Sequence, residues 1–276
     1  MPLSLMHDLD RESERLETPC GGGSLVWRRW GSGDPIVLMH GGSGSWTHWI
    51  RNIPILRQHY EVWAIDIPGL GDSAMPAEPF VPQSCADAVA LGFKRHFTPD
   101  RRARLVCFSF GCHVGTLAAR ELNHLLNGMV IIGTAALGLN RSRNRPLPKE
   151  RSSMTAEERR EIHRAVLENL MFSDAARIDD EAIELQAVNI ANARFRSREF
   201  AATEDVRHGL AKVTVPLSTI WGRGDVVANP DVETAIAILA EHHPELRHRI
   251  IENAGHWVMY EQPEAFNTAL LEFLGT

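Results

Sequence analysis

Several features are scarce or missing in this 276-residue chain, and each absence narrows its function. There is no surplus of basic residues: 29 lysines and arginines face 35 aspartates and glutamates, which argues against nucleic acid as a partner. The four cysteines, at positions 20, 85, 107 and 112, form no Cys-x-x-Cys pair, so free thiols in a reducing compartment are expected. No His-Glu-x-x-His spacing is present either, so no zinc site is indicated.

Long apolar runs are also missing. The most apolar stretch, residues 128–139, is too short to span a bilayer and contains three glycines. The first fourteen residues lack both a basic segment and a continuous apolar segment, so neither a signal peptide nor membrane insertion is expected. We therefore predict a cytoplasmic protein that acts on a small molecule, and whether it forms a homo-oligomer stays open.

The rest of the sequence alternates between two kinds of segment. Short apolar runs without polar alternation, as in strands buried on both faces, are separated by stretches with helical spacing. This order is typical of β-α-β units and predicts an α/β fold with a mostly parallel sheet. We expect strands at 35–39, 62–66, 104–107, 128–132, 215–221 and 249–251, a hairpin at 15–19 and 24–30, and helices at 49–60, 86–97, 111–126 and 261–274.

The alternation stops between residues 140 and 205, where no strand is indicated. Thr155 followed by Glu158 is typical of a helix that begins with a capping box. Further helices are expected at 180–191 and 194–204. We predict a core of residues 1–139 and 206–276 that is interrupted by an inserted helical lid, residues 140–205.

The predicted lid is rich in arginine. Such residues could recognise a substrate carboxylate, but a run of charges more often forms a solvated helix face. The arginines stand at 141, 143, 145, 151, 159, 160, 164, 194, 196 and 198.

The strongest local signal is Cys107-Phe-Ser-Phe-Gly111, between an expected strand and an expected helix. A serine on this sharp turn holds its hydroxyl above the sheet edge, and the N–H of the next residue, Phe110, can bind an oxyanion, as in a Gly-x-Ser-x-Gly nucleophile elbow. Cys107 replaces the first glycine, at a place that needs a small side chain. On these five residues alone, Ser109 fits a helix N-cap equally well.

Three further segments favour the catalytic interpretation. The loop His40-Gly-Gly42 follows an early strand and can offer a second N–H to an oxyanion, most simply that of Gly42. Asp225 and His256 each follow a later strand, and ligand sites in open α/β sheets form at the C-terminal ends of strands. The order Ser109, Asp225, His256 therefore predicts a nucleophile, an acid and a base.

Two other acids are candidates for the triad, and several aromatic side chains are candidates for the substrate pocket. Asp66 and Asp72 belong to an Asp-x-Pro-Gly-x-Gly-x-Ser segment and are better explained as turn residues. Phe108 beside the serine and Trp257 beside the histidine are expected to contact the substrate in an apolar pocket.

Together these features resemble the α/β-hydrolase superfamily. The resemblance rests on the His40-Gly-Gly loop, the turn that begins at Asp66, the serine elbow, the helical insertion, Gly-Arg-Gly-Asp225 and Gly-His256. It implies an eight-stranded, mostly parallel sheet with a lid over Ser109, and catalytic roles for Ser109, Asp225 and His256. It implies no metal and no organic cofactor.

The resemblance favours a carboxylesterase-like serine hydrolase that cleaves a small ester through an acyl-enzyme. Gly-His256-Trp257 also looks like the hydrolases that cleave carbon–carbon bonds in aromatic ring-fission products of the 2-hydroxy-6-oxo-dienoate type. That group usually has Asn before the serine, where this chain has Phe108. A cofactor-free haloperoxidase-like enzyme would use the same three residues. A non-catalytic ligand-binding protein is also conceivable, although a complete set argues against it.

Overall fold

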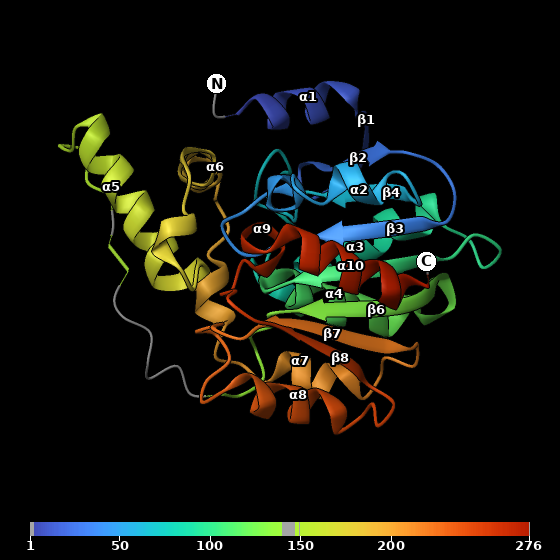
Figure 1. Ribbon diagram of the computed structural model, residues 1–276. Helices are drawn as coiled ribbons and strands as arrows, with labels where there is room; N and C mark the ends of the chain where they lie inside the picture. The colour runs from blue at the N-terminus through green and yellow to red at the C-terminus, as the bar shows by residue number, and fades with distance from the viewer. Residues whose placement is uncertain (1–2, 140–146, 149, 276) are drawn as a thin grey trace.

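An eight-stranded sheet forms the centre of the protein (Figure 1). The computed structural model describes residues 3–139, 147–148 and 150–275. The strand order is β1-β2-β4-β3-β5-β6-β7-β8; β2 pairs antiparallel with β1 and β4, and all other pairs are parallel. The strands are β1 Glu14–Cys20, β2 Gly23–Trp30, β3 Pro35–Met39, β4 Glu61–Ile65, β5 Ala103–Phe108, β6 Leu126–Ile132, β7 Leu217–Gly222 and β8 Arg247–Ile251.

Helices cover both faces of the sheet, which explains why the central strands read as unbroken apolar runs. Every residue of β3, β4 and β7 is buried. One core joins the sheet to α3, α4, α7 and α8, and a second core on the opposite face joins it to α1, α2, α9 and α10. The α-helices are α1 Ser4–Glu12, α2 Ile53–Leu56, α3 Pro82–His96, α4 Phe110–Leu122, α5 Ala156–Val166, α6 Asp180–Ala191, α7 Asp205–Leu210, α8 Val232–Ala240, α9 Val258–Glu261 and α10 Pro263–Leu274.

The charged N-terminal segment is a helix docked on the core. Leu9 of α1 is buried, and its carbonyl accepts a hydrogen bond of 2.8 Å from the Trp30 indole. Asp10 pairs with the buried Arg28 of β2 at 2.7 Å. Apolar burial and a charged anchor together hold this helix in place.

The segment that joins β6 to β7 carries α5 and α6, and α5 stands away from the sheet (Figure 1). We call its described residues, 147–148 and 150–205, the insertion; the arginines at 141, 143 and 145 lie outside the described residues. Thr155 and Glu158 form the expected capping box, and α6 has the expected bounds.

The helix expected at 194–204 was wrong. This stretch holds only the short 3-10 helix η5, Ser197–Phe200. The N–H groups of Arg194 and Phe195 both donate to the carbonyl of Gly69, and the Arg194 guanidinium donates to the carbonyls of Gly71 and Ser73. These bonds to a distant turn compete with helical bonds, so tertiary contacts override the local spacing.

Two helix boundaries also differ from expectation. The stretch at 49–60 is a 3-10 turn, η1 Trp46–Trp49, followed by the one-turn helix α2. The helix expected to reach residue 126 ends at Leu122, because Leu126 already pairs with Ala103 as the first residue of β6. No helix in the described ranges is long and apolar enough to cross a membrane.

Candidate active site

Ser109 occupies a strained turn between β5 and α4. Its φ of +51° lies in the left-handed region, a conformation that costs a non-glycine residue about 1–3 kcal/mol. The turn is held by two hydrogen bonds of 2.9 Å, from Ser109 N to Ile132 O and from Cys112 N to Ser109 O. This geometry is typical of a nucleophile elbow, in which strain presents the hydroxyl at the C-terminal edge of the sheet.

Glycines around the turn allow segments to approach closely. A Cβ on Gly111 would lie 2.5 Å from His40 O, so the end of β3 can pass directly beside the elbow. A Cβ on Gly115, one turn further along α4, would lie 2.4 Å from Cys107 Sγ. Gly115 therefore makes the room that the larger Cys107 side chain needs at the first position of the elbow motif.

The structure brings Ser109, His256 and Asp225 into one hydrogen-bonded chain. The Ser109 hydroxyl lies 2.9 Å from His256 Nε2, and both oxygens of Asp225 lie 2.9 Å from His256 Nδ1. His256 and Asp225 are both buried. The carboxylate can hold the Nδ1–H tautomer, which leaves Nε2 free to accept the serine proton.

Gly133, which directly follows β6, makes room for this pair. It has a φ of +52°, and a Cβ at this position would lie 2.9 Å from Asp225 Oδ2 and 3.0 Å from His256 Nδ1. Any larger side chain would push against both groups. A glycine at the end of a buried strand often marks a close approach of another segment, so Gly133 is the feature of the sequence that indicates this contact.

Gly42 and Phe110 adjoin each other beside the serine. A Cβ placed on Gly42 would lie 3.5 Å from the Cβ of Phe110. The N–H groups of Gly42 and of Phe110 are both without a hydrogen-bond partner among the described residues.

Two buried histidines fix the preceding glycine. Gly41 N–H donates to His48 Nδ1 at 3.2 Å, and the Gly41 carbonyl lies 2.7 Å from His40 Nδ1. Burial lowers the pKa of His40, and burial with neighbouring His40 and His256 lowers the pKa of His48 well below its ordinary range. Both imidazoles therefore stay neutral and act as rigid supports for the glycine loop.

Among the residues that the structure describes, Asp66 and Asp72 pair with Arg28 and with no histidine. Arg28 contacts Asp66 at 3.1 Å and Asp72 at 2.6 Å. Asp66 also accepts hydrogen bonds from Trp46 N at 2.8 Å and Asp72 N at 3.1 Å. These contacts support the interpretation of both acids as turn residues.

A chamber of about 110 Å³ lies next to Ser109 and His256. Phe108 lines it. Trp257 is not among its lining residues: its indole N–H donates to His48 O at 3.1 Å, and its ring stacks on Tyr260. Other side chains that line the chamber are His48, Phe110, His113, Asn169, Leu170, Met171, Ser197, Arg198 and Val227.

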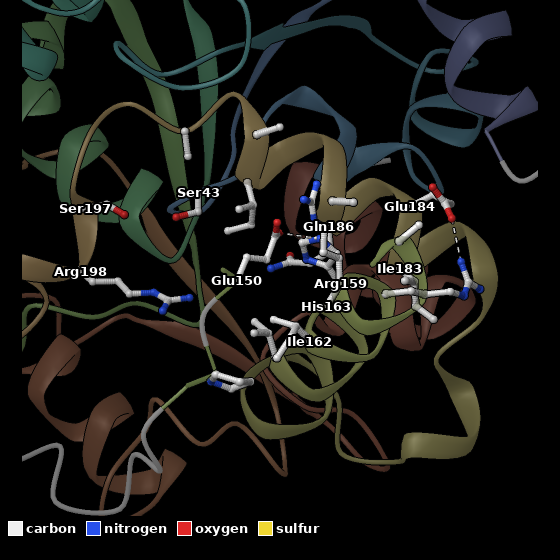
Figure 2. A pocket seen from close by; sticks show the side chains of 18 of the residues that line it. Ser43, Glu150, Arg159, Ile162, His163, Ile183, Glu184, Gln186, Ser197 and Arg198 are labelled. Atoms are coloured by element: carbon white, nitrogen blue, oxygen red, sulfur yellow. Dashed lines mark hydrogen bonds and ion pairs between the residues drawn. The ribbon is translucent and has the colours of Figure 1, made fainter. Parts of the chain in front are cut away.

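A larger cleft of about 1120 Å³ lies within the insertion, and Ser43 is the one residue of its described lining that belongs to the core. Figure 2 shows α5 residues such as Ile162 and α6 residues such as Ile183 around it, with Arg198 extending into it from the side. Ser197 and Arg198 line both the chamber and the cleft, so they stand where the two meet. The Arg198 guanidinium forms no hydrogen bond or ion pair with any described residue.

Sequence reasoning did not single out Ser197, Arg198 or His48 as parts of this site. Arg198 was one of ten arginines, and nothing in the sequence separated it from its neighbours. Ser197 reaches the site only because its segment crosses over the glycine loop, where a Cβ on Gly42 would lie 2.3 Å from Ser197 Oγ.

Comparisons with known proteins place these observations in a family. The sequence model of the Alpha/beta hydrolase family matches residues 36–269. The chain is similar to the 2-hydroxy-6-oxo-6-(2'-aminophenyl)hexa-2,4-dienoic acid hydrolase of Metapseudomonas resinovorans, with 29% identity over 92% of this chain and 88% of that protein. It is also similar to the 2-hydroxy-6-oxo-6-phenylhexa-2,4-dienoate hydrolase of Burkholderia cepacia, with 25% identity over 88% of each chain. Among solved structures, a putative aryl esterase from Burkholderia cenocepacia superposes with a TM-score of 0.77 at 23% identity, over 95% of this chain and 98% of that chain.

Proposed function

The chain belongs to the alpha/beta hydrolase family, and from that premise we propose that it is a serine hydrolase that cleaves a small carboxylic ester or related carbonyl compound through an acyl-enzyme. One observation carries the proposal. The hydroxyl of Ser109, the imidazole of His256 and the carboxylate of Asp225 are linked by contacts of 2.9 Å, at the end of a strained elbow. This is the arrangement that activates a serine.

The reaction follows from these contacts. His256 Nε2 accepts the Ser109 proton as Oγ attacks the carbonyl carbon, and Asp225 stabilises the imidazolium. His256 then protonates the leaving alcohol, which leaves the acyl group on Ser109. A water molecule, deprotonated by His256, hydrolyses this ester and restores the hydroxyl.

The Gly42 and Phe110 N–H groups would stabilise the tetrahedral oxyanion. Each donor of this kind is worth about 10²–10³-fold in kcat. The paired histidines that hold Gly41 keep the first donor in place without adding positive charge, because both are neutral.

The sizes of the two cavities favour a substrate with one small and one large group. The chamber of about 110 Å³ holds only a small group at the reacting carbonyl. The cleft of about 1120 Å³ can take a larger second half, with an apolar wall formed by Ile162, Val166 and Ile183. We propose that the insertion is the lid that forms this binding cleft over the catalytic chamber.

A second candidate is the hydrolysis of a carbon–carbon bond in a 2-hydroxy-6-oxo-dienoate. The names of the two similar hydrolases favour it. So does Arg198, whose guanidinium has no partner among the described residues and lines the chamber, where it could bind a substrate carboxylate. Phe108 in place of asparagine favours the ester.

Active-site labelling tests the assignment of the nucleophile. A fluorophosphonate probe should label the protein once, and Ser109→Ala should abolish labelling, because the activated Oγ is the reacting atom. Peptide mass spectrometry locates the adduct. The control is Ser218→Ala, a buried serine of β7 outside the site, which should label at the wild-type rate. Equal labelling of the Ser109→Ala variant would defeat the assignment.

Arg198 separates the two candidate reactions. The purified enzyme is assayed in parallel on neutral p-nitrophenyl esters and on a vinylogous diketone acid. If the acid is a substrate, Arg198→Ala should raise its KM by about 10–100-fold, the worth of a charge-assisted hydrogen bond, while the KM of the neutral ester stays nearly constant. Arg207→Ala, which removes a cation paired with Glu241 and lining neither cavity, is the matched control. Turnover of the acid but not of any ester would reject the ester hypothesis.

A further inference from the structure

The loop that carries His256 is tied to the insertion by a buried carboxylate. Glu261, the last residue of α9, is only 3% exposed. One of its oxygens accepts a hydrogen bond of 2.6 Å from Gly255 N, directly before the histidine. The carboxylate therefore reaches back across α9 to the loop from which that helix starts.

The same carboxylate binds the insertion. It accepts hydrogen bonds from Ser173 N at 3.0 Å, from Ser173 Oγ at 2.9 Å and from Asp174 N at 2.9 Å. Among the described residues, no cation pairs with it; Arg177 donates only to the Glu261 backbone carbonyl. Charge-assisted bonds from N–H and O–H donors thus offset the cost of burying this charge.

Backbone contacts between the two segments surround this carboxylate. Trp257 N donates to Met171 O at 2.8 Å, on the other side of His256. A Cβ on Gly255 would lie 2.6 Å from Ser173 N, so the two backbones are in direct contact there. The histidine is therefore flanked on both sides by residues bonded to segment 171–174 or to the carboxylate that holds it.

We propose that Glu261 is a positioning residue that joins segment 171–174 of the insertion to the histidine loop, so that the insertion and the catalytic base are held as one unit. This role rests on the proposed function, in which His256 is the base. Glu261 does not line the chamber, and in the described part of the chain it forms no hydrogen bond with Ser109, so it acts through the backbone of Gly255.

Glu261→Gln tests the proposal with little change of shape. The amide has one acceptor oxygen, so its NH₂ must face either Gly255 N–H or the donors of Ser173 and Asp174. The Gly255 side offers fewer donors, and the NH₂ should therefore turn there and release the histidine loop. We expect kcat on a p-nitrophenyl ester to fall about 10–100-fold, with KM within about 3-fold, because a small misplacement of the base slows chemistry more than binding. The rate of fluorophosphonate labelling should fall in parallel.

Two controls separate this role from general destabilisation. Leu270→Ala opens a buried position on α10 and should lower Tm while leaving kcat near the wild-type value. Glu264→Gln removes an exposed carboxylate from the same helix and should change neither. All variants are assayed well below their Tm. A Glu261→Gln enzyme with wild-type kcat would overturn the proposal.

A milder variant decides the matter if Glu261→Gln does not fold. Ser173→Ala removes one of the donors to the carboxylate and keeps both backbone donors. It should fold and lower kcat about 2–5-fold at constant KM, and an unchanged kcat in this variant would overturn the proposal. Failure of the proposed function has a different signature: the wild-type enzyme itself would neither label at Ser109 nor turn over substrate.

Discussion

Gly133 leaves no room for a larger side chain beside Asp225 and His256, so its replacement by alanine should slow the reaction. A Cβ there would lie 2.9 Å from Asp225 Oδ2 and 3.0 Å from His256 Nδ1, whereas ordinary contact begins at 3.4 Å. Gly133→Ala must therefore move the carboxylate by 3.4 − 2.9, or about 0.5 Å, and the imidazole by about 0.4 Å. The Asp–His and His–Ser contacts of 2.9 Å would lengthen toward the weak end of the hydrogen-bond range.

The expected loss of rate follows from how strongly catalysis depends on the placement of the reacting groups and on the tautomer of the imidazole. A misplacement of about 1 Å typically costs about 10²-fold in rate, so a shift of half that size should cost about 10-fold. Loss of the correct imidazole tautomer costs far more, up to about 10⁴-fold, so any weakening of the Asp225 contact adds to the effect. We expect kcat to fall about 10–100-fold. The positive φ costs alanine a further 1–2 kcal/mol or so, which should lower Tm by several degrees.

Gly128→Ala, in the strand that Gly133 follows, is the matched control. A Cβ on Gly128 would lie 3.4 Å from its nearest neighbour, Pro216 O, and this glycine has no positive φ. Its kcat should stay within about 2-fold of wild type. Ester hydrolysis, probe labelling and thermal unfolding are measured on both variants. A Gly133→Ala enzyme with lowered Tm but full kcat would refute the reasoning, because the pair would then tolerate the displacement.

Two further predictions concern stability. Gly115→Ala should lower the free energy of unfolding in urea by about 1–3 kcal/mol, because its Cβ would lie 2.4 Å from Cys107 Sγ. Adding Cys107→Gly should restore most of this loss. If the effects of the two substitutions simply add, the proposed pairing of Gly115 with Cys107 is contradicted. Burial lowers the pKa of His40 and His48, so the stability that their neutral forms contribute is complete above the ordinary value of 6.5 and is lost as pH falls below it. His48→Asn should therefore make Tm less dependent on pH between about 7 and 5, and parallel curves would show that His48 does not contribute.

The sheet and the three central residues could be predicted from sequence for a simple reason. Parallel strands buried on both faces leave an unalternated apolar pattern, and their C-terminal ends meet at one edge. Ser109 and Asp225 directly follow or lie just beyond such strands, β5 and β7. His256 lies beyond β8, an edge strand in which only Ile251 is fully buried, so its signal was the Gly-His loop between that strand and the last helix. The order of strands in space did not have to be known.

The supports of the site were not predictable in the same way. In the sequence, Glu261 looks like an ordinary acidic residue at the start of the helix expected at 261–274. Its partners Ser173 and Asp174 lie 88 and 87 residues away in the chain. Arg194 fits a helical pattern, but its side chain binds carbonyls of a turn more than one hundred residues earlier. Contacts of this kind depend on the packed fold and leave no periodic signal.

The two departures around Ser109 show why a motif must be judged with its neighbours. Cys107 replaces a glycine, and Gly115 on the facing helix supplies the missing space, so this change is structural. For Phe108, no glycine of the described residues plays a corresponding role. It is fully buried against the rings of His48 and His256, at centroid distances of 5.5 and 4.8 Å, and it lines the chamber. An asparagine there would lose this packing and would bury an amide without hydrogen-bond partners. We expect the free energy of unfolding to fall by about 3–5 kcal/mol. Phe108 therefore forms an apolar wall beside Ser109 that is packed against two histidine rings.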